Sequence, residues 1–358
     1  MLQHVATGMN ILIVKLSAFG DIIHAIPAME TLRQRGVSVH WLVDARYAFV
    51  TELFPKDVHV HVVALKGERR FHHALQAIGE LRKLCFDAVL DLQGLIKSGI
   101  IAKAASQSAP VYGFDRQETP EWPNHWFITP VSFHPDERHV VQKYMRIASA
   151  PFDTPDDAIV YAPPRISINE TQHAAAASIV ASWKNKPHTL LHVGGGWQTK
   201  RLDLQQWKEL INGLHERGAS ITLSWGNESE LHRARRIVDG YGLATVLPER
   251  LNIHALAGVL HAAEAVIGMD TGVLHLAAAL GAPTVTLWGP SASWNAAPLG
   301  KSDAHIESKP ACGPCFQRRC ECFICLPSIK PERIVDAWAH VKEQKGQVSY
   351  LPSFCLSL

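Results

Sequence analysis

The chain has 358 residues, 47% of them hydrophobic and 19% charged, which suits a globular protein of two domains. A formal net charge of +2, without a long block of Lys or Arg, argues against binding to nucleic acid. No apolar run reaches the roughly 20 residues that cross a bilayer, and the polar start lacks a signal-peptide core, so we expect a cytoplasmic protein.

Strands and helices are expected to alternate in the first half of the chain. Apolar runs predict strands over residues 11–14, 39–43, 58–63 and 88–90. The helical spacing of apolar side chains predicts helices over residues 21–35, 72–84 and 95–105. Such repeated units favour a parallel sheet with helices on both faces.

The alternation resumes after an irregular, aromatic stretch at 113–134 and a Pro-rich linker at 151–164. The expected strands span residues 189–193, 220–225, 265–269 and 284–288. The expected helices span residues 204–217, 228–238, 251–262, 274–280 and 331–345. We therefore expect an α/β protein of two doubly wound domains that face a cleft, with ligands at the carboxyl ends of the strands.

One chemical motif follows the first expected strand and ends at Asp21. Ser17 and Gly20 permit a tight turn there, and Asp21 stands at the mouth of the next helix. Asp21 could simply cap that helix, because Asp is a preferred capping residue. Alternatively, its carboxylate points into the cleft and accepts a proton from a hydroxyl group.

Three motifs in the second half suit a nucleotide diphosphate. Glycines at 194–196 let the backbone approach a ligand, and Lys200 can neutralise phosphate charge. Glu230 can accept hydrogen bonds from a ribose, and the Asp-Thr-Gly turn at 270–272 offers free N–H groups at a helix start. Each motif also has a plainer interpretation. Lys200 could be solvated on a flexible loop, Glu230 could be a first-turn glutamate favoured by the helix dipole, Asp270 or Thr271 could cap the helix, and His275 could pack against the preceding strand.

Taken together, these motifs resemble glycosyltransferase family 9, the ADP-heptose:lipopolysaccharide heptosyltransferases. The resemblance runs from about residue 9 to the C-terminal helix. It is carried by the Ile-Val-Lys-Leu-Ser-Ala-Phe-Gly-Asp start, the Lys200 loop, the Trp-Gly-x-x-x-Glu segment and the Asp-Thr-Gly-x-x-His turn. The stretch at 91–98, Asp-Leu-Gln-Gly-Leu-Ile-Lys-Ser, is most similar to heptosyltransferase I, the members that add the first heptose to Kdo on lipid A.

The resemblance implies a GT-B fold of two Rossmann-like domains. Residues 1–165 would bind the acceptor, residues 166–330 would bind the ADP-sugar, and the helix and tail at 331–358 could pack back on the N-terminal domain. The implied reaction is an inverting transfer of L-glycero-D-manno-heptose from ADP-heptose to the Kdo inner core of lipopolysaccharide.

The resemblance also assigns roles to individual residues. Asp21 would be the general base. The implied donor-binding residues are Lys200 on the diphosphate, Glu230 on the ribose, Asp270, Thr271 and Gly272 at the helix start, and His275. The implied acceptor-side residues are Ser17, Lys97, Arg116 and His139.

No metal ion is expected to be needed for the transfer. A single displacement requires one base and a stabilised leaving group. Lys200 and the helix N-terminus can meet the charge that develops on ADP, and the chain lacks the Asp-x-Asp pair that clamps metal and nucleotide in other glycosyltransferases.

Five cysteines lie close together between residues 312 and 325. Two Cys-x-x-Cys pairs, Cys312 with Cys315 and Cys322 with Cys325, have the spacing of a structural Zn or Fe site, and the alternative is a loop of reduced thiols. Family members that modify proteins carry such pairs, so a protein Ser or Thr is an alternative acceptor, as is a more distal core heptose. A nucleotide-sugar-binding or metal-sensing protein on the same scaffold is the non-enzymatic alternative.

A lipid A acceptor implies peripheral contact with the inner membrane. The aromatic region at 122–127, with Arg116, Arg138 and Lys143 around it, is the candidate contact. Alternatively, these aromatic side chains pack under their own loop. The expected partners are thus ADP-heptose and Kdo-lipid A or another glycan or protein acceptor, without nucleic acid.

Overall fold

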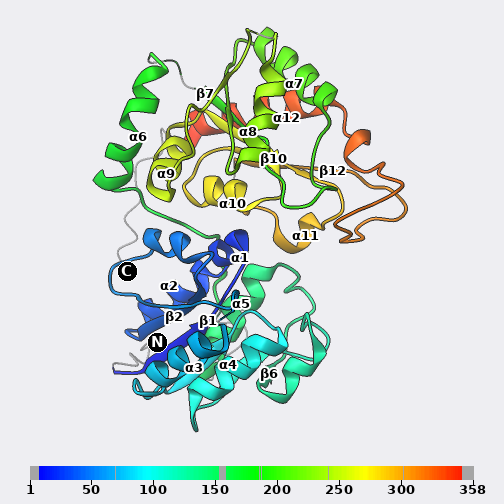
Figure 1. The fold of residues 1–358 in the computed structure, drawn as a ribbon. Helices are drawn as coiled ribbons and strands as arrows, with labels where there is room; N and C mark the ends of the chain where they lie inside the picture. Colours follow the sequence, from blue (N-terminus) through cyan, green and yellow to red (C-terminus); the bar gives the residue numbers. More distant parts are fainter. Residues whose placement is uncertain are drawn as a thin grey trace. The chain divides into compact units, whose positions relative to one another are not determined.

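The computed structural model describes residues 8–68, 70–152, 159–184, 186, 188–240, 242–300 and 302–348. The chain divides into two compact units, Met1–Pro164 and Arg165–Leu358, which we call the first and second domains. Each is built on a parallel sheet covered by helices (Figure 1). Among the described residues, no helix is both long enough and apolar enough to cross a membrane.

The first domain forms one parallel sheet. Its strands are β1 (Asn10–Val14), β2 (Ser38–Asp44), β3 (His59–Val63), β4 (Ala88–Asp91), β5 (Val111–Phe114) and β6 (Thr129–Val131). Its α-helices are α1 (Phe19–His24), α2 (Ile26–Gln34), α3 (Arg70–Arg82), α4 (Ile96–Ser106) and α5 (Val140–Ser149). The spatial order β3-β2-β1-β4-β5-β6 reverses between β1 and β4.

Three local features of this domain differ from the prediction, and one of them is that helix α5 was not expected. The single helix expected over 21–35 is divided into α1 and α2 at Ala25, with Pro27 in the first turn of α2. Proline fits the first turn of a helix but not its interior, which explains the break. Strands β5 and β6 were not predicted, because they are short and β6, which contains Pro130, is an exposed edge strand.

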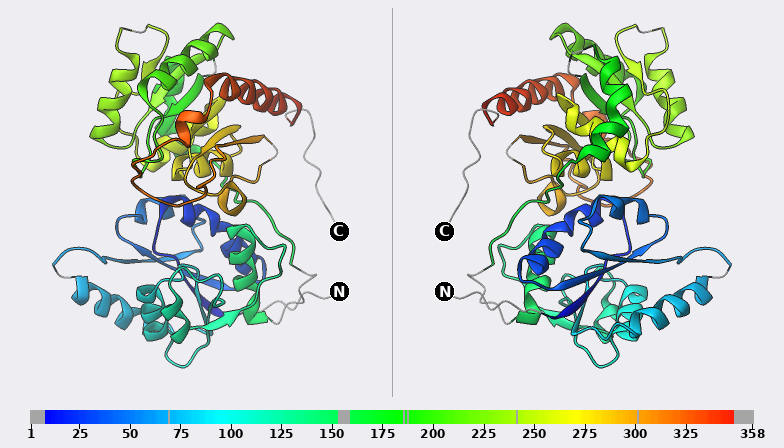
Figure 2. Two further views of the ribbon diagram at one scale, coloured as in Figure 1. Left: turned by 90° about the vertical axis from the view of Figure 1, so that its right-hand side faces the viewer. Right: turned by 90° about the vertical axis from the view of Figure 1, so that its left-hand side faces the viewer.

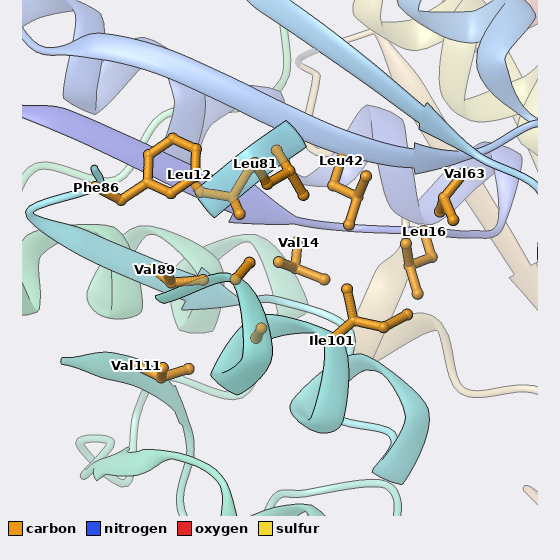
Figure 3. Close-up of a cluster of buried hydrophobic side chains, with 12 residues drawn as sticks. Leu12, Val14, Leu16, Leu42, Val63, Leu81, Phe86, Val89, Ile101 and Val111 are labelled. Atoms are coloured by element: carbon orange, nitrogen blue, oxygen red, sulfur yellow. The ribbon is translucent and has the colours of Figure 1, made fainter. Parts of the chain in front are cut away.

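One face of this sheet packs against α3 and α4. Leu12 and Val14 of β1 lie in the centre of a cluster whose side chains have little or no exposure (Figure 3). Leu81 of α3 and Ile101 of α4 cover them from the helical side. Burial on both faces explains why β1 reads as a continuous apolar run rather than an alternating one.

The second domain repeats the same architecture. Its strands are β7 (His188–His192), β8 (Ser220–Ser224), β9 (Thr245–Val246), β10 (Ala265–Met269), β11 (Thr284–Trp288) and β12 (Asp303–Glu307). Its α-helices are α6 (Glu170–Ser182), α7 (Leu204–Glu216), α8 (Glu228–Val238), α9 (Ile253–Ala262), α10 (Gly272–Ala279), α11 (Ser293–Ala296) and α12 (Pro331–Val348). In chain order both sheets follow the Rossmann pattern 3-2-1-4-5-6, so the order of the second sheet reverses between β7 and β10.

Helix α12 belongs to the second domain. It packs against α7 and lies beside β10, β11 and β12, as Figure 2 shows for the red helix. Trp338 anchors it, because its buried indole N–H donates to Thr189 Oγ1 at 2.8 Å. The sequence-based suggestion that the C-terminal helix and tail pack back on the first domain stays a prediction, and residues 349–358 lie outside the described residues.

Three histidines stack on the outer strands of the first sheet. His40 of β2 is 7% exposed, and its ring lies 4.7 Å from that of His59 and 5.2 Å from that of His61. His40 Nδ1 and His61 Nε2 are 2.9 Å apart, so one of them donates to the other. Ser38 and the ring of Phe86 complete the surroundings of His40. Burial and the two neighbouring imidazoles lower the pKa of His40 to about 4.

This cluster predicts a loss of stability in mild acid. An unfolded histidine titrates near 6.5, so between pH 6.5 and 4 the unfolded chain binds more protons and stability falls as the pH falls. His40→Gln should remove a contribution on the order of 2 kcal/mol to the difference in unfolding free energy between pH 7 and pH 4.5, measured by urea denaturation. The exposed His72→Gln is the control. An equal acid loss in wild type and His40→Gln would contradict this role.

Candidate active site

The candidate site of the first domain lies where β1 and β4 end. Val14 and Asp91 are paired in register at these ends. Gln93, just after β4, accepts hydrogen bonds from the backbone N–H groups of Leu16 (3.1 Å) and Ser17 (2.9 Å). Strand ends beside a reversal of strand order are where open α/β sheets bind ligands, so this loop pair is a candidate ligand-binding edge.

Asp21 lies on this edge, in the third position of α1. The residue that caps α1 is Ala18, and Asp21 Oδ2 accepts the Ala18 N–H at 3.0 Å. The capping interpretation is therefore correct in one respect, because the carboxylate satisfies a backbone donor at the helix start. The side chain is only partly buried, so the carboxylate retains access to solvent.

A buried polar network lies directly behind Asp21. Lys15 is 2% exposed, and its ammonium donates to the Leu92 carbonyl at 2.9 Å and the Tyr144 hydroxyl at 2.7 Å. Burial lowers the pKa of Lys15, and the charges of Asp21 and Asp91 partly offset that effect. The Lys15 amine is thus fixed behind Asp21, and the sequence motif alone did not single it out.

Asp91 organises the turn that follows β4. It is fully buried and accepts hydrogen bonds from Ser98 Oγ (3.0 Å), Asn124 Nδ2 (2.6 Å) and the N–H groups of Gln93 and Gly94. Burial raises the pKa of Asp91, and these donors counteract the rise. Asp91 and Ser98 are the first and last residues of the Asp-x-Gln-Gly-Leu-x-Lys-Ser stretch. Their hydrogen bonds hold the turn in shape, which explains why these two residue types stand there.

The four acceptor-side residues differ in their surroundings. Ser17 is partly exposed in the loop after β1, and Lys97 is exposed near the start of α4. Arg116 is also exposed, with its guanidinium 5.5 Å from the centre of the Trp122 ring. His139 is buried: its Nδ1 accepts the Val141 N–H at the start of α5, and its ring packs edge-on against His24. An acceptor role for these residues remains a prediction.

The glycine loop after β7 is closely packed in the second domain. A Cβ at Gly195 would come within 2.1 Å of the Lys200 carbonyl oxygen. A Cβ at Gly194 would lie 2.4 Å from His192 Nε2 and 3.0 Å from the Glu230 carboxylate. Glycine is thus required at both positions, because any side chain would displace the residues that form the site.

Lys200 and Asp270 join this loop to the end of β10. The Lys200 ammonium forms an ion pair with the Asp270 carboxylate and lies 4.4 Å from the centre of the Trp197 ring. Asp270 also accepts from Ser291 Oγ at 2.7 Å and lies 3.1 Å from His275 Nε2. Burial opposes ionisation of Asp270, but His275 and Lys200 together hold its pKa well below the usual range. The structure thus brings together three of the predicted donor-site residues.

Helix α10 starts next to this ion pair. Thr271 is its N-cap in extended conformation, and Gly272 is its first residue. The Thr271 hydroxyl does not cap the helix: its Oγ1 is buried and has no hydrogen-bond partner in the described structure. Buried hydroxyl groups are normally paired, so this oxygen and the N–H groups of the first turn suit an added oxyanion.

Glu230 stands near the start of α8, where β8 ends. Its Oε2 accepts the Gly226 N–H at 2.8 Å, and Asn227 caps the helix through the Glu230 N–H. His192, the last residue of β7, lies beside it and was not among the predicted site residues. Burial lowers the pKa of His192, and the charge of Glu230 partly offsets that effect. His192 could have been identified as a site residue from the sequence, because it is the last residue of β7, the strand that pairs with β10.

The five clustered cysteines share one small cavity in the second domain. The cavity has a volume of about 20 Å³, and Cys312, Cys315, Cys320, Cys322 and Cys325 all line it. All five are free thiols, and burial raises the pKa of Cys325. Across the described ranges, no three His, Cys, Asp or Glu side chains are arranged to hold a metal ion. The structure therefore does not support the four-cysteine metal site, which remains a prediction from spacing.

Comparison with known proteins identifies the family. The model for glycosyltransferase family 9 (heptosyltransferase) matches residues 75–323, which is most of the chain. This chain belongs to glycosyltransferase family 9. It is therefore an enzyme of the heptosyltransferase family, as the motifs predicted.

Individual relatives agree over nearly the whole length. The chain is 31% identical to lipopolysaccharide heptosyltransferase 1 of Pseudomonas aeruginosa over 87% of both chains. It is 29% identical to lipopolysaccharide heptosyltransferase 1 of Escherichia coli K12, over 79% of this chain and 88% of that one. The solved structure of E. coli heptosyltransferase WaaC with ADP aligns with a TM-score of 0.72 and 22% identity, covering 93% of this chain and all of that one. The predicted GT-B fold is confirmed.

Proposed function

We propose that this family 9 enzyme transfers L-glycero-D-manno-heptose from ADP-heptose to Kdo of the lipopolysaccharide inner core, with inversion at the sugar. The observation that carries the donor half is the meeting of Lys200, Asp270 and the unpaired Thr271 hydroxyl at the start of α10. The names of the relatives, and the ADP in the solved WaaC structure, support the choice of nucleotide and acceptor.

In the proposed reaction Lys200 and the first turn of α10 hold the diphosphate. The acceptor hydroxyl oxygen bonds to C1 of heptose as the bond from C1 to the ADP oxygen breaks, so ADP leaves with the electron pair. Cationic and N–H donors fixed where this charge develops stabilise the transition state. Glu230 is positioned to accept hydrogen bonds from the ribose, since it lies beside the glycine loop.

Asp21 is the proposed general base. Its carboxylate is partly exposed and held in place by the Ala18 N–H. Lys15 lies buried behind it, with its amine fixed by the Leu92 carbonyl and the Tyr144 hydroxyl. Removal of the acceptor proton by a fixed carboxylate is the one acid–base step that an inverting displacement needs.

The first test compares acceptors directly. The full chain is incubated with ADP-heptose and either Kdo-lipid A or a surface protein rich in Ser and Thr, and the products are identified by mass spectrometry. Addition of one heptose to Kdo-lipid A alone is expected. Transfer to the protein alone, or to a core that already carries heptose, would replace the proposed acceptor while leaving the family activity intact.

Asp21→Asn tests the base without removing its structural bond. The amide oxygen can still accept the Ala18 N–H, whereas the side chain can no longer take a proton. We expect kcat to fall by about 10²- to 10⁴-fold while the Kd for ADP, measured by calorimetry, stays unchanged. Wild-type turnover in this variant would exclude Asp21 as the base.

Lys200→Ala tests the diphosphate site. Loss of a charge-assisted hydrogen bond should weaken ADP binding about 10- to 100-fold. Lys330→Ala, an exposed lysine of the same domain, is the matched control and should leave the Kd unchanged. If Lys200→Ala binds ADP as wild type does, Lys200 does not hold the diphosphate.

We also propose that Trp122 and Trp126 contact the membrane that carries the acceptor. They are 51% and 71% exposed, so the alternative in which they pack under their loop is wrong. Exposed indoles beside a cation such as Arg116 suit a lipid interface. Lys143 takes no part, because it is buried in an ion pair with Glu118.

The membrane contact is tested by vesicle sedimentation. Replacing both Trp122 and Trp126 with Ser should lower the fraction of protein bound to phosphatidylglycerol vesicles several-fold, because burial of each indole stabilises the bound state. Trp294→Ser is the control, since Trp294 is 50% exposed and lies in the second domain. Equal binding of the double variant and the wild type would contradict the proposal.

A further inference from the structure

A second cavity in the second domain adjoins the glycine loop and is lined mainly by residues to which no role has been assigned so far. Its volume is about 630 Å³, within the range of pockets that hold small molecules. Its walls come from the end of the glycine loop, the start of α7, helix α8 and the cysteine segment. The lining residues are Gly196, Trp197, Gln198, Arg201, Leu202, Asp203, Arg233, Arg318, Arg319 and Phe323. Lys200, Glu230, Asp270 and Thr271 are not among them.

Four arginines line this cavity. None of them forms an ion pair with a carboxylate in the part of the chain that the structure describes. Asp203 is the acidic residue of the lining, and its Oδ1 accepts the Gln206 N–H as the cap of α7. The cavity therefore carries an excess of positive charge.

Two of the arginines are fixed by backbone contacts. Arg201 Nε donates to the Gly195 carbonyl at 3.2 Å, and Arg233 Nη1 donates to the Leu202 carbonyl at 3.1 Å. Burial lowers the pKa of Arg233, the charges of Arg201 and Arg236 lower it further, and the charge of Glu230 opposes them. Like charges held this close repel one another, and a bound oxyanion would relieve that repulsion.

The other two arginines are exposed on the cysteine segment, between Cys315 and Cys320. The guanidinium of Arg318 lies 5.5 Å from the centre of the Trp197 ring. Trp197 and Phe323 supply aromatic surface to a cavity that is otherwise charged and polar. Guanidinium groups bind phosphate through paired N–H donors, while an aromatic ring suits the apolar face of a sugar.

We propose that this cavity binds a phosphorylated sugar, with the four arginines on its phosphoryl group and Trp197 and Phe323 against its ring. The volume exceeds what a bare phosphate ion fills, and the aromatic walls give the remaining space an apolar lining. The site adds a phosphosugar-binding function to the second domain and does not depend on which acceptor the enzyme uses.

The test measures binding of glucose 6-phosphate to the full chain by calorimetry, in the presence of saturating ADP. Binding that weakens as salt rises is expected, because charges at an open cavity are screened. Arg318→Ala combined with Arg319→Ala should raise the Kd at least tenfold and leave the Kd for ADP unchanged. Arg235→Ala, an exposed arginine of α8 outside the cavity, is the control and should bind as wild type does.

Four results would overturn the proposal. Glucose binding as tightly as glucose 6-phosphate would exclude recognition of the phosphoryl group. Inorganic phosphate binding as tightly as the phosphosugar would exclude a role for the aromatic walls. Loss of glucose 6-phosphate binding when ADP is present would assign the cavity to the donor site. Binding to phosphatidylglycerol vesicles that depends on Arg318 and Arg319, without binding of the soluble phosphosugar, would assign it to a lipid surface.

Discussion

The second domain depends on one buried carboxylate, that of Asp270. It accepts hydrogen bonds from His275 and Ser291 and pairs with Lys200, so one residue joins the ends of β7 and β10, helix α10 and the turn after β11. A carboxylate removed from water remains charged only when such partners surround it. The Asp270 carboxylate is therefore part of what holds four chain segments together.

The reversal of strand order places that carboxylate. In each sheet the order reverses beside the first strand, between β1 and β4 and between β7 and β10. Loops that leave the sheet in opposite directions open a crevice at this point. Asp21 follows β1, and Lys200 follows β7, the equivalent strand of the second sheet, although the two halves show no repeat in sequence.

The two cavities beside the glycine loop differ in kind. The one lined by cysteines is small and apolar, and it leaves the thiols free. The one lined by arginines is large and charged, and it shares the same loop and the same cysteine segment. Thr199 ties the two segments together, because its hydroxyl donates to the Gln317 carbonyl at 2.6 Å. The cysteine segment thus forms part of a wall next to the donor loop.

The sequence by itself determined the fold class and the family, and it singled out Lys200 and Asp270, which the structure brings together. Buried parallel strands appear in a sequence as continuous apolar runs. Gly, Lys and Asp that directly follow such runs can be recognised from the sequence alone, because they are neighbours along the chain. It did not predict β5 and β6, the break between α1 and α2, or the places of His192 and Lys15. Only the tertiary structure gathered Arg201, Arg233, Arg318 and Arg319 into one cavity, because no spacing rule relates residues more than a hundred positions apart. It also placed all five clustered cysteines around one small cavity, which their spacing alone could not specify.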